Sequence, residues 1–293
     1  MEVTPSISQV LHEGIQKLQS SGIDTPRLDA EVLLAHTLSI DRVALYRNPD
    51  ILLDGNEQRR YSALLERRAR REPVAYITGS KEFGALTFTL TPDVLIPRPE
   101  TEMLLDKTLS TCDFLLTRKD HLRILELGTG SGILAVNISK KLPSCTIFAT
   151  DISSKKIAVA RKNARLNGVD SRILFLVGDL FHSITIHEEN GKFDCIIFNP
   201  PYLSHDDWIQ AQPEIKDYEP MDSLWGGHDG LAFYRSLIPA AVSLLQPGGY
   251  LLLEIGGTQA ERITRMLCTE KVYRQVHVLQ DLAGIDRVVA AHI

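Results

Sequence analysis

The spacing of the hydrophobic residues divides the chain into two parts. In the first part, apolar residues recur at helical spacing, as at Val10, Leu11, Ile15 and Leu18. That period is typical of amphipathic helices that bury one face. We therefore expect residues 1–75 to form a small helical domain.

One helix of this first part carries many arginines. We expect it to span Gly55–Arg71, with Tyr61, Leu64 and Leu65 on its inner face. Its remaining positions include Arg59, Arg60, Arg67, Arg68, Arg70 and Arg71. A run of charge on a helix is usually a solvated face, and we predict one here. The alternative is a contact surface for an acidic or RNA-bound macromolecule.

A proline-rich connector follows. Residues 83–90 alternate weakly between apolar and polar side chains, which predicts a short hairpin. Pro92, Pro97 and Pro99 then stiffen the chain around the sequence LIPRPETE, ahead of a helix from about Glu100 to Leu116. We expect residues 76–98 to form an interdomain hairpin and linker.

The second part alternates short apolar runs with helical segments. The expected strands are Arg123–Leu127, Thr146–Thr150, Ile173–Val177, Asp194–Phe198, Tyr250–Glu254, Tyr273–Leu279 and Arg287–Ala291. With helices between the first five and after the fifth, this order predicts a parallel sheet covered on both faces. The short linker between the last two strands predicts an antiparallel pair at the sheet edge. Residues 99–293 are thus expected to form an α/β domain.

Composition and charge narrow the class of protein. The net charge of −5 provides no general attraction to nucleic acid or to anionic membranes, and no apolar run approaches a bilayer-spanning length. The first ten residues, MEVTPSISQV, have neither the basic start nor the apolar core of a secretory signal. The cysteines form no CxxC pair, and the histidines are dispersed. We expect a cytoplasmic protein without a metal.

A glycine-rich loop follows the first strand of the α/β part. Its residues are Gly128, Thr129, Gly130, Ser131 and Gly132. Glycines permit a tight turn and a close approach of a ligand to the main chain. The GxGxxG fingerprint of dinucleotide-binding proteins would need glycine at position 133, where this chain has isoleucine. The loop also lacks the lysine that follows the last glycine in the P-loop of nucleoside triphosphate-binding proteins.

Acidic residues end the next two strands. Asp151 follows the second strand, where a carboxylate can accept both hydroxyls of a ribose. Asp179 follows the third strand, where an adenine edge could be recognised. With the GxGxG loop, these positions fit a nucleoside that carries a small zwitterionic tail and no phosphate. We therefore predict S-adenosylmethionine rather than NAD.

The sequence FNPPYL ends the fourth strand, which is next to the first in this topology. The side-chain carbonyl of Asn199 and the main-chain carbonyl of Pro200 are two acceptors that could hold both hydrogens of one –NH2 group. Held in this way, the nitrogen lone pair can be aligned with the methyl group. Tyr202 offers a flat face for a planar group. Adenine N6, guanine N2 and glutamine amides all remain candidates at this point.

Longer motifs point to one family. Beside ELGTGSG and NPPY, the chain contains REPVAYITGSKEFGALTF, VLIPRPETE and YEP followed by LWGGHDGLAFYR. With these, the chain resembles the PrmC/HemK family of protein-(glutamine-N5) methyltransferases over nearly its whole length. The resemblance implies a class I, Rossmann-like methyltransferase fold. It also implies S-adenosylmethionine as cofactor, the Gly-Gly-Gln glutamine of bacterial peptide-chain release factors as substrate, and a helical N-terminal domain that grips the release factor.

The resemblance also assigns roles to residues. It implies a cofactor site formed by Gly128, Thr129, Gly130, Ser131, Gly132, Asp151, Asp179, Leu180 and Asn199. Many relatives carry tryptophan where this chain has Leu180, so stacking on the adenine is not expected here. Substrate glutamine binding falls on Asn199, Pro200, Pro201 and Tyr202, of which Asn199, Pro200 and Tyr202 are expected to be catalytic.

Two segments have open assignments. Arg98 and Glu100 either line the channel through which the substrate loop enters or only shape the start of a helix. The stretch from Ser183 to Lys192 receives no role. The competing functions are adenine-N6 methylation of DNA or RNA, and a non-catalytic module that uses the fold to bind a partner.

Overall fold

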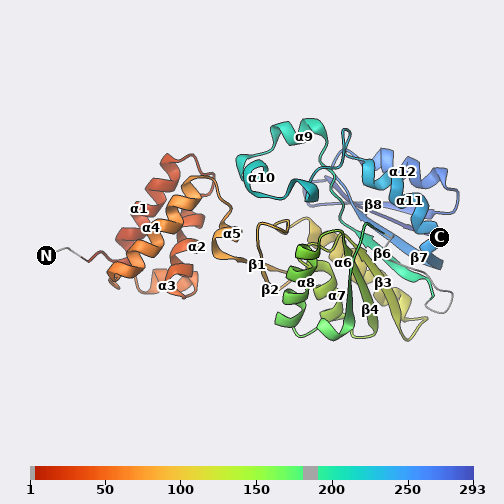
Figure 1. Cartoon of the computed structure of the whole chain (residues 1–293), viewed down its shortest axis with the longest axis horizontal. Coiled ribbons are helices and arrows are strands. Elements are labelled where there is room, and N and C mark those ends of the chain that lie inside the picture. Colours follow the sequence, from red (N-terminus) through yellow and green to blue (C-terminus); the bar gives the residue numbers. More distant parts are fainter. Residues whose placement is uncertain (1–3, 181–190) are drawn as a thin grey trace. The chain divides into compact units, whose positions relative to one another are not determined.

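The computed structural model describes residues 4–180 and 191–293. The chain divides into two compact units, one of Met1–Ser80 with Gln212–Tyr218 and one of Lys81–Ala211 with Glu219–Ile293. Figure 1 shows the helices and strands of each unit. No helix within the described ranges is long and apolar enough to cross a membrane.

The first unit is helical, as the spacing of its apolar residues predicts. Its described helices are α1 (Ile7–Ser20), α2 (Pro26–Leu38), α3 (Arg42–Arg47), α4 (Gly55–Ala69), α5 (Val74–Thr78) and α10 (Pro213–Tyr218). Ser6 and Asp54 each form a capping box at the start of α1 and α4, which satisfies backbone donors that a helix start leaves free. Leu18, Leu34 and Tyr61 lie in its hydrophobic core.

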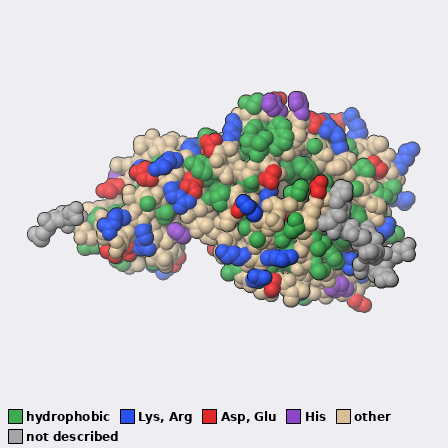
Figure 2. Space-filling model, in the orientation of Figure 1, with side chains coloured by type: hydrophobic (Ala, Val, Ile, Leu, Met, Phe, Trp, Pro, Cys, Tyr) green, Lys and Arg blue, Asp and Glu red, His purple; other side chains and the backbone are tan. Residues whose placement is uncertain are grey.

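The arginine-rich helix α4 is only partly a solvated face. Arg59, Arg60, Arg67 and Arg70 are exposed, and Figure 2 shows basic and acidic side chains interspersed on the drawn face of this unit. Arg68 is different, because it is 7% exposed and forms ion pairs with Asp29 and Glu214. The prediction of a solvated face is therefore wrong for Arg68, whose charge is neutralised inside the unit.

The second unit contains the expected mixed sheet. Within the described residues its strands are β3 (Leu122–Leu127), β4 (Cys145–Asp151), β5 (Ile173–Val177), β6 (Phe193–Phe198), β7 (Leu245–Glu254), β8 (Arg274–Gln280) and β9 (Asp286–His292), in the spatial order β5-β4-β3-β6-β7-β9-β8. The pairings from β5 to β7 are parallel. β9 pairs antiparallel with β7 and β8. The predicted strands and the antiparallel edge are confirmed.

Helices cover both faces of this sheet (Figure 1). The covering helices are α6 (Thr101–Leu116), α7 (Ile133–Lys141), α8 (Ser154–Leu166), α11 (Ala232–Leu244) and α12 (Ala260–Thr269). The unit also contains α9 (His205–Gln210), which has no buried residue, and the short 3-10 turns η1 (Asp170–Arg172) and η3 (Met221–Ser223). Ile124 packs in one core cluster with α6, α7 and α8, whereas its neighbour Leu125 packs in another with α11 and α12. Successive residues of β3 therefore point to opposite, equally buried faces.

Two further segments complete the description. The predicted hairpin is present but begins earlier than residues 83–90, because its strands are β1 (Ser80–Phe83) and β2 (Leu86–Thr89). The helix expected between β5 and β6 falls largely on residues 181–190, which lie outside the described residues, and so does most of the stretch from Ser183 to Lys192.

Candidate active site

The candidate site lies where the strand order reverses. From β3 the chain continues to β4 on one side, while β6 pairs with β3 on the other. β3 and β6 are parallel, with Leu127 opposite Phe198, so the glycine loop and Asn199 both begin at this edge. Crevices at such reversals are where α/β sheets bind ligands.

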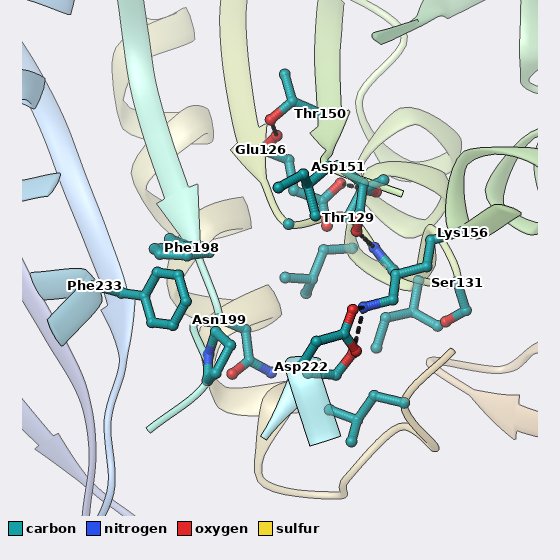
Figure 3. A pocket seen from close by; sticks show the side chains of 18 of the residues that line it. Glu126, Thr129, Ser131, Thr150, Asp151, Lys156, Phe198, Asn199, Asp222 and Phe233 are labelled. Atoms are coloured by element: carbon teal, nitrogen blue, oxygen red, sulfur yellow. Dashed lines mark hydrogen bonds and ion pairs between the residues drawn. The ribbon is translucent and has the colours of Figure 1, made fainter. Parts of the chain in front are cut away.

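A cavity of about 260 Å³ opens at this edge. Its lining includes Gly128, Thr129, Gly130, Ser131, Asp151, Asp179, Leu180, Arg98, Asn199 and Pro201. Figure 3 shows Asn199 at the end of β6, with Phe198 and Phe233 beside it. Of the residues predicted for the cofactor, all except Gly132 therefore line one cavity.

The glycine loop has backbone geometry that side chains would disturb. Gly128 has a φ of +61°, and a Cβ there would lie 3.0 Å from Cε2 of Phe198. Gly132 has a φ of +81°, and a Cβ there would lie 3.0 Å from Cβ of Ala160. Glycine is required at both places because left-handed conformations are strained for other residues. Gly132 therefore allows the start of α7 to approach α8 closely, and Gly128 allows the loop to pass beside Phe198 at the end of β6.

The carboxyl of Glu126, near the end of β3, anchors the glycine loop through hydrogen bonds. This carboxyl is 2% exposed and accepts hydrogen bonds from Oγ1 of Thr129 at 2.8 Å and from the backbone N–H of Ala135 at 3.1 Å. Burial raises the pKa of Glu126 to about 8. Glu126 therefore fixes both ends of the loop.

Asp151 joins the loop to the end of β4. One carboxylate oxygen accepts from the N–H of Gly130 at 3.0 Å, and the other accepts from the N–H of Ser153 at 3.0 Å. The carboxylate is 5% exposed and borders the cavity. Each carboxylate oxygen has a second lone pair, so Asp151 can accept from ligand hydroxyls while it keeps both main-chain bonds.

Asn199 borders two cavities. Beside the larger one is a smaller cavity lined by Leu95, Arg98, Asn199, Pro200, Tyr202, Ser223, Leu224 and Glu254. The Nδ2 group of Asn199 donates to Oγ1 of Thr101 at 3.3 Å. That bond occupies the donor end of the amide and leaves the Oδ1 acceptor for a ligand.

Arg98 and Glu100 are placed differently. Arg98 borders both cavities, and its guanidinium pairs with Glu219, a buried carboxyl that also accepts from the N–H of Ile96 at 3.1 Å. Glu100 is absent from the described lining of either cavity and lies 3.7 Å from Arg287 in an ion pair. Arg98 is therefore in a position to contact a ligand, whereas the contact that the structure gives Glu100 is its ion pair with Arg287.

Several residues at the site were not expected from the sequence. Thr101 and Glu254 lie beside Asn199, and Lys156 forms an ion pair with Asp222 at 2.9 Å at the rim of the larger cavity (Figure 3). Phe233 packs edge-on against Phe198 with ring centroids 6.2 Å apart. The sequence pointed to two of them only indirectly, because Thr101 lies in the motif VLIPRPETE and Phe233 lies in LWGGHDGLAFYR. In the described part of the chain, no group of acidic, histidine and cysteine residues could hold a metal ion.

Glycines from a distant segment pack against the NPPY backbone. A Cβ on Gly226 would lie 2.7 Å from the carbonyl oxygen of Pro201, and one on Gly230 would lie 2.4 Å from that of Tyr202. Gln259 donates to the same Tyr202 carbonyl at 2.9 Å. Burial raises the pKa of Tyr202 above its usual value. The segment WGGHDG thus has a physical reason for its glycines, since larger residues would displace the NPPY loop.

Comparison with known proteins agrees with this geometry. Residues 9–79 match the family described as "PrmC N-terminal domain", and residues 118–288 match a "Methyltransferase domain" family. A release factor glutamine methyltransferase of Geobacter sulfurreducens is 40% identical over 94% of this chain and 93% of its own length. The enzyme of the same name from Coxiella burnetii is 39% identical over 99% and 97%. The chain belongs to the release factor glutamine methyltransferase family.

Fold comparison is consistent with that membership. A crystal structure of a methyltransferase from Pyrococcus furiosus superposes with a TM-score of 0.54 at 20% identity, over 78% of this chain and 98% of the other. The expected class I methyltransferase fold is confirmed.

The cofactor of this methyltransferase is S-adenosylmethionine, and the cavity fits it. The glycine loop has no room for side chains at Gly128, so a ligand can approach the main chain. Asp151 offers acceptors for ribose hydroxyls, and Asp179 and Leu180 border the cavity farther along. We propose these residues, with Thr129, Gly130, Ser131 and Asn199, as the cofactor site.

We expect Asp151→Ala to lower cofactor affinity by about one to two powers of ten, since hydrogen bonds to a charged group contribute about 1.5–3 kcal/mol. Titration calorimetry with S-adenosylhomocysteine would measure the loss. Asp151→Asn is the matched variant, because it keeps one oxygen acceptor while removing the charge. Equal affinity of wild type and Asp151→Ala would contradict the assignment.

The buried carboxyl of Glu254 predicts a pH-dependent stability. Burial raises its pKa from 4.5 to about 7, and hydrogen bonding from Thr101 opposes that rise. Because the folded state then holds the proton more tightly than the unfolded state, this stabilisation is complete below about pH 4.5 and is lost as the pH rises through about 7. We expect Glu254→Gln to remove about 3 kcal/mol of pH dependence in the free energy of unfolding. Urea titrations of wild type and Glu254→Gln at several pH values would measure the free energy of unfolding. The same dependence of this free energy on pH in both proteins would refute the prediction.

Proposed function

We propose that this protein transfers a methyl group from S-adenosylmethionine to the side-chain amide nitrogen of the glutamine in the Gly-Gly-Gln motif of peptide-chain release factors. One observation supports this most strongly: Asn199 lies at the border of two cavities, with its donor end bonded to Thr101. The larger cavity has room for the cofactor, and the smaller one, of about 20 Å³, adjoins it at Asn199. The names of the relatives support the choice of release factors over other bearers of an –NH2 group.

In this proposal the chain acts on the amide by holding its hydrogens. Oδ1 of Asn199 and the carbonyl oxygen of Pro200 each accept one hydrogen of the glutamine –NH2. The lone pair of an amide nitrogen is delocalised into the carbonyl and is therefore a weak nucleophile. Fixing both hydrogens orients this lone pair toward the methyl group. The same acceptors stabilise the positive charge that develops on nitrogen.

Other residues complete the substrate site. Tyr202 lines the smaller cavity and provides the flat face for the planar amide, Pro201 lines the larger cavity, and Arg98, paired with Glu219, borders both. When bound, S-adenosylmethionine supplies a methyl group activated by a positively charged sulfur. We assign recognition of the release factor to the helical unit of residues 1–75, as the family resemblance implies, and treat residues 76–98 as its linker.

Mass spectrometry of a release factor after reaction tests the proposal. The protein, labelled S-adenosylmethionine and a purified bacterial release factor should yield one added methyl group on the Gly-Gly-Gln glutamine. A release factor with that glutamine changed to alanine is the control and should remain unlabelled. Duplex DNA and RNA in parallel reactions test the competing adenine-N6 function. Label on nucleic acid, or none on the release factor while the cofactor still binds, would overturn the proposal.

A further inference from the structure

One lysine in the wall of the larger cavity has no part in the proposed reaction. Lys156 lies in the first turn of α8 and is 6% exposed, whereas lysine side chains usually keep their ammonium in water. It borders the larger cavity together with Asp222 and Ser223 of η3. Burying an ammonium costs free energy unless the charge is paired, so the contacts of Lys156 account for its position.

The ammonium of Lys156 forms a bridge between α8 and η3. It donates to Oδ2 of Asp222 at 2.9 Å and to Oγ of Ser223 at 2.7 Å. Figure 3 shows the contact with Asp222 as a dashed line. These partners lie 66 and 67 residues away along the chain. Because all three residues line the larger cavity, the bridge spans this part of the cavity wall.

The η3 turn is otherwise anchored beside its two ends. Before it, Glu219 is a buried carboxyl that pairs with Arg98. After it, the carbonyl of Leu224 accepts from the N–H of Leu203 at 2.8 Å. The turn itself contains no buried residue. In the described part of the chain, both hydrogen bonds between η3 and α8 come from Lys156, so this lysine decides whether the turn stays against the wall.

Fold stability does not explain the bridge. The side chain of Asp222 is 59% exposed, and an ion pair with a solvated partner contributes little to stability. The adjacent Lys155 forms a pair with Asp93 at 3.4 Å while its own side chain remains 76% exposed. Burial is therefore what distinguishes Lys156 from its neighbour, and that burial places its ammonium in the wall of the cavity.

We propose that Lys156 is a positioning residue that clasps η3 against α8 and thereby gates the entry and exit of the cofactor at the larger cavity. The clasp opens for S-adenosylmethionine to enter and for S-adenosylhomocysteine to leave. Ser223 also borders the smaller cavity, so the clasp fixes a wall that both cavities share. This inference goes beyond the proposed function and rests on the proposed cofactor site.

Rates of cofactor exchange test the clasp without any release factor. Lys156→Met keeps the apolar stem and removes the ammonium, and Lys155→Met is the matched control at the neighbouring position. Surface plasmon resonance with immobilised protein and S-adenosylhomocysteine measures association and dissociation. We expect both rate constants to rise at least about tenfold in Lys156→Met, as for loss of hydrogen bonds to a charged group, while Kd changes by less than about threefold. Both should stay within about twofold of wild type in Lys155→Met.

The ratio of the two rate constants separates a gate from a direct contact. If Lys156 only contacted the bound cofactor, dissociation alone would become faster and Kd would rise by the same factor. Asp222→Asn changes the exposed partner, leaves the fold intact, and should raise both rate constants about threefold. A rise in dissociation alone, or wild-type rate constants in Asp222→Asn, would overturn the proposal. A protein that exchanges its cofactor as expected but methylates no release factor would refute the proposed function and leave the clasp standing.

Discussion

Asn199→Ala is expected to lower kcat for release factor methylation by about 10²–10³, the range found when one fixed polar group is removed from a transition-state site. The substitution removes the Oδ1 acceptor, so the glutamine nitrogen would be held by the Pro200 carbonyl alone. The larger cavity keeps its glycine loop, which follows β3, and Asp151, which ends β4. Affinity for S-adenosylhomocysteine should therefore fall by less than about tenfold, since Asn199 is only one of several proposed cofactor contacts.

Single-turnover kinetics and calorimetry on the same preparations would separate these two effects. Asn48→Ala removes the same amide from an exposed position outside both cavities and should leave cofactor affinity unchanged. Asn199→Asp keeps an acceptor and should lose less activity than Asn199→Ala. Full turnover by Asn199→Ala would show that its oxygen does not hold the substrate.

The strands could be predicted from the sequence because the sheet is buried on both faces. Ile124 and Leu125 are adjacent and each is fully buried, in a different core cluster. Strands in that environment carry successive apolar residues, as in Cys195-Ile196-Ile197-Phe198 of β6, and such a run is visible without any knowledge of its neighbours. The order of runs and helices then fixes a parallel topology and places the glycine loop beside NPPY.

The chemistry of the site was predictable only where it is local. Gly128, Asp151 and Asn199 each lie at the end of a strand or directly after one, so the topology alone brings them to one edge. Thr101 was missed because it lies 98 residues from its partner Asn199. Glu254 ends β7 as Asp151 ends β4, but the sequence alone does not show that the Glu254 carboxyl is buried beside Asn199.

Arg68 shows the same limit in the helical unit. Its partners Asp29 and Glu214 are 39 and 146 residues away along the chain, and one of them belongs to α10. Within α4, Arg67 and Arg68 are identical in type and adjacent in sequence. One forms an exposed pair with Glu72, and the other is buried with two carboxylates. Composition gives no means to tell them apart.

We therefore expect Arg68→Ala to destabilise the helical unit by about 3–5 kcal/mol, since it leaves the 6% exposed carboxylate of Asp29 without its cation. Hydrogen exchange in α2 and α4 would measure the change, because each factor of ten in rate corresponds to about 1.4 kcal/mol in local opening. Arg67→Ala is the neighbouring control and should cost less than about 1 kcal/mol. Similar exchange rates in both variants would mean that Arg68 does not stabilise the unit through its buried ion pairs.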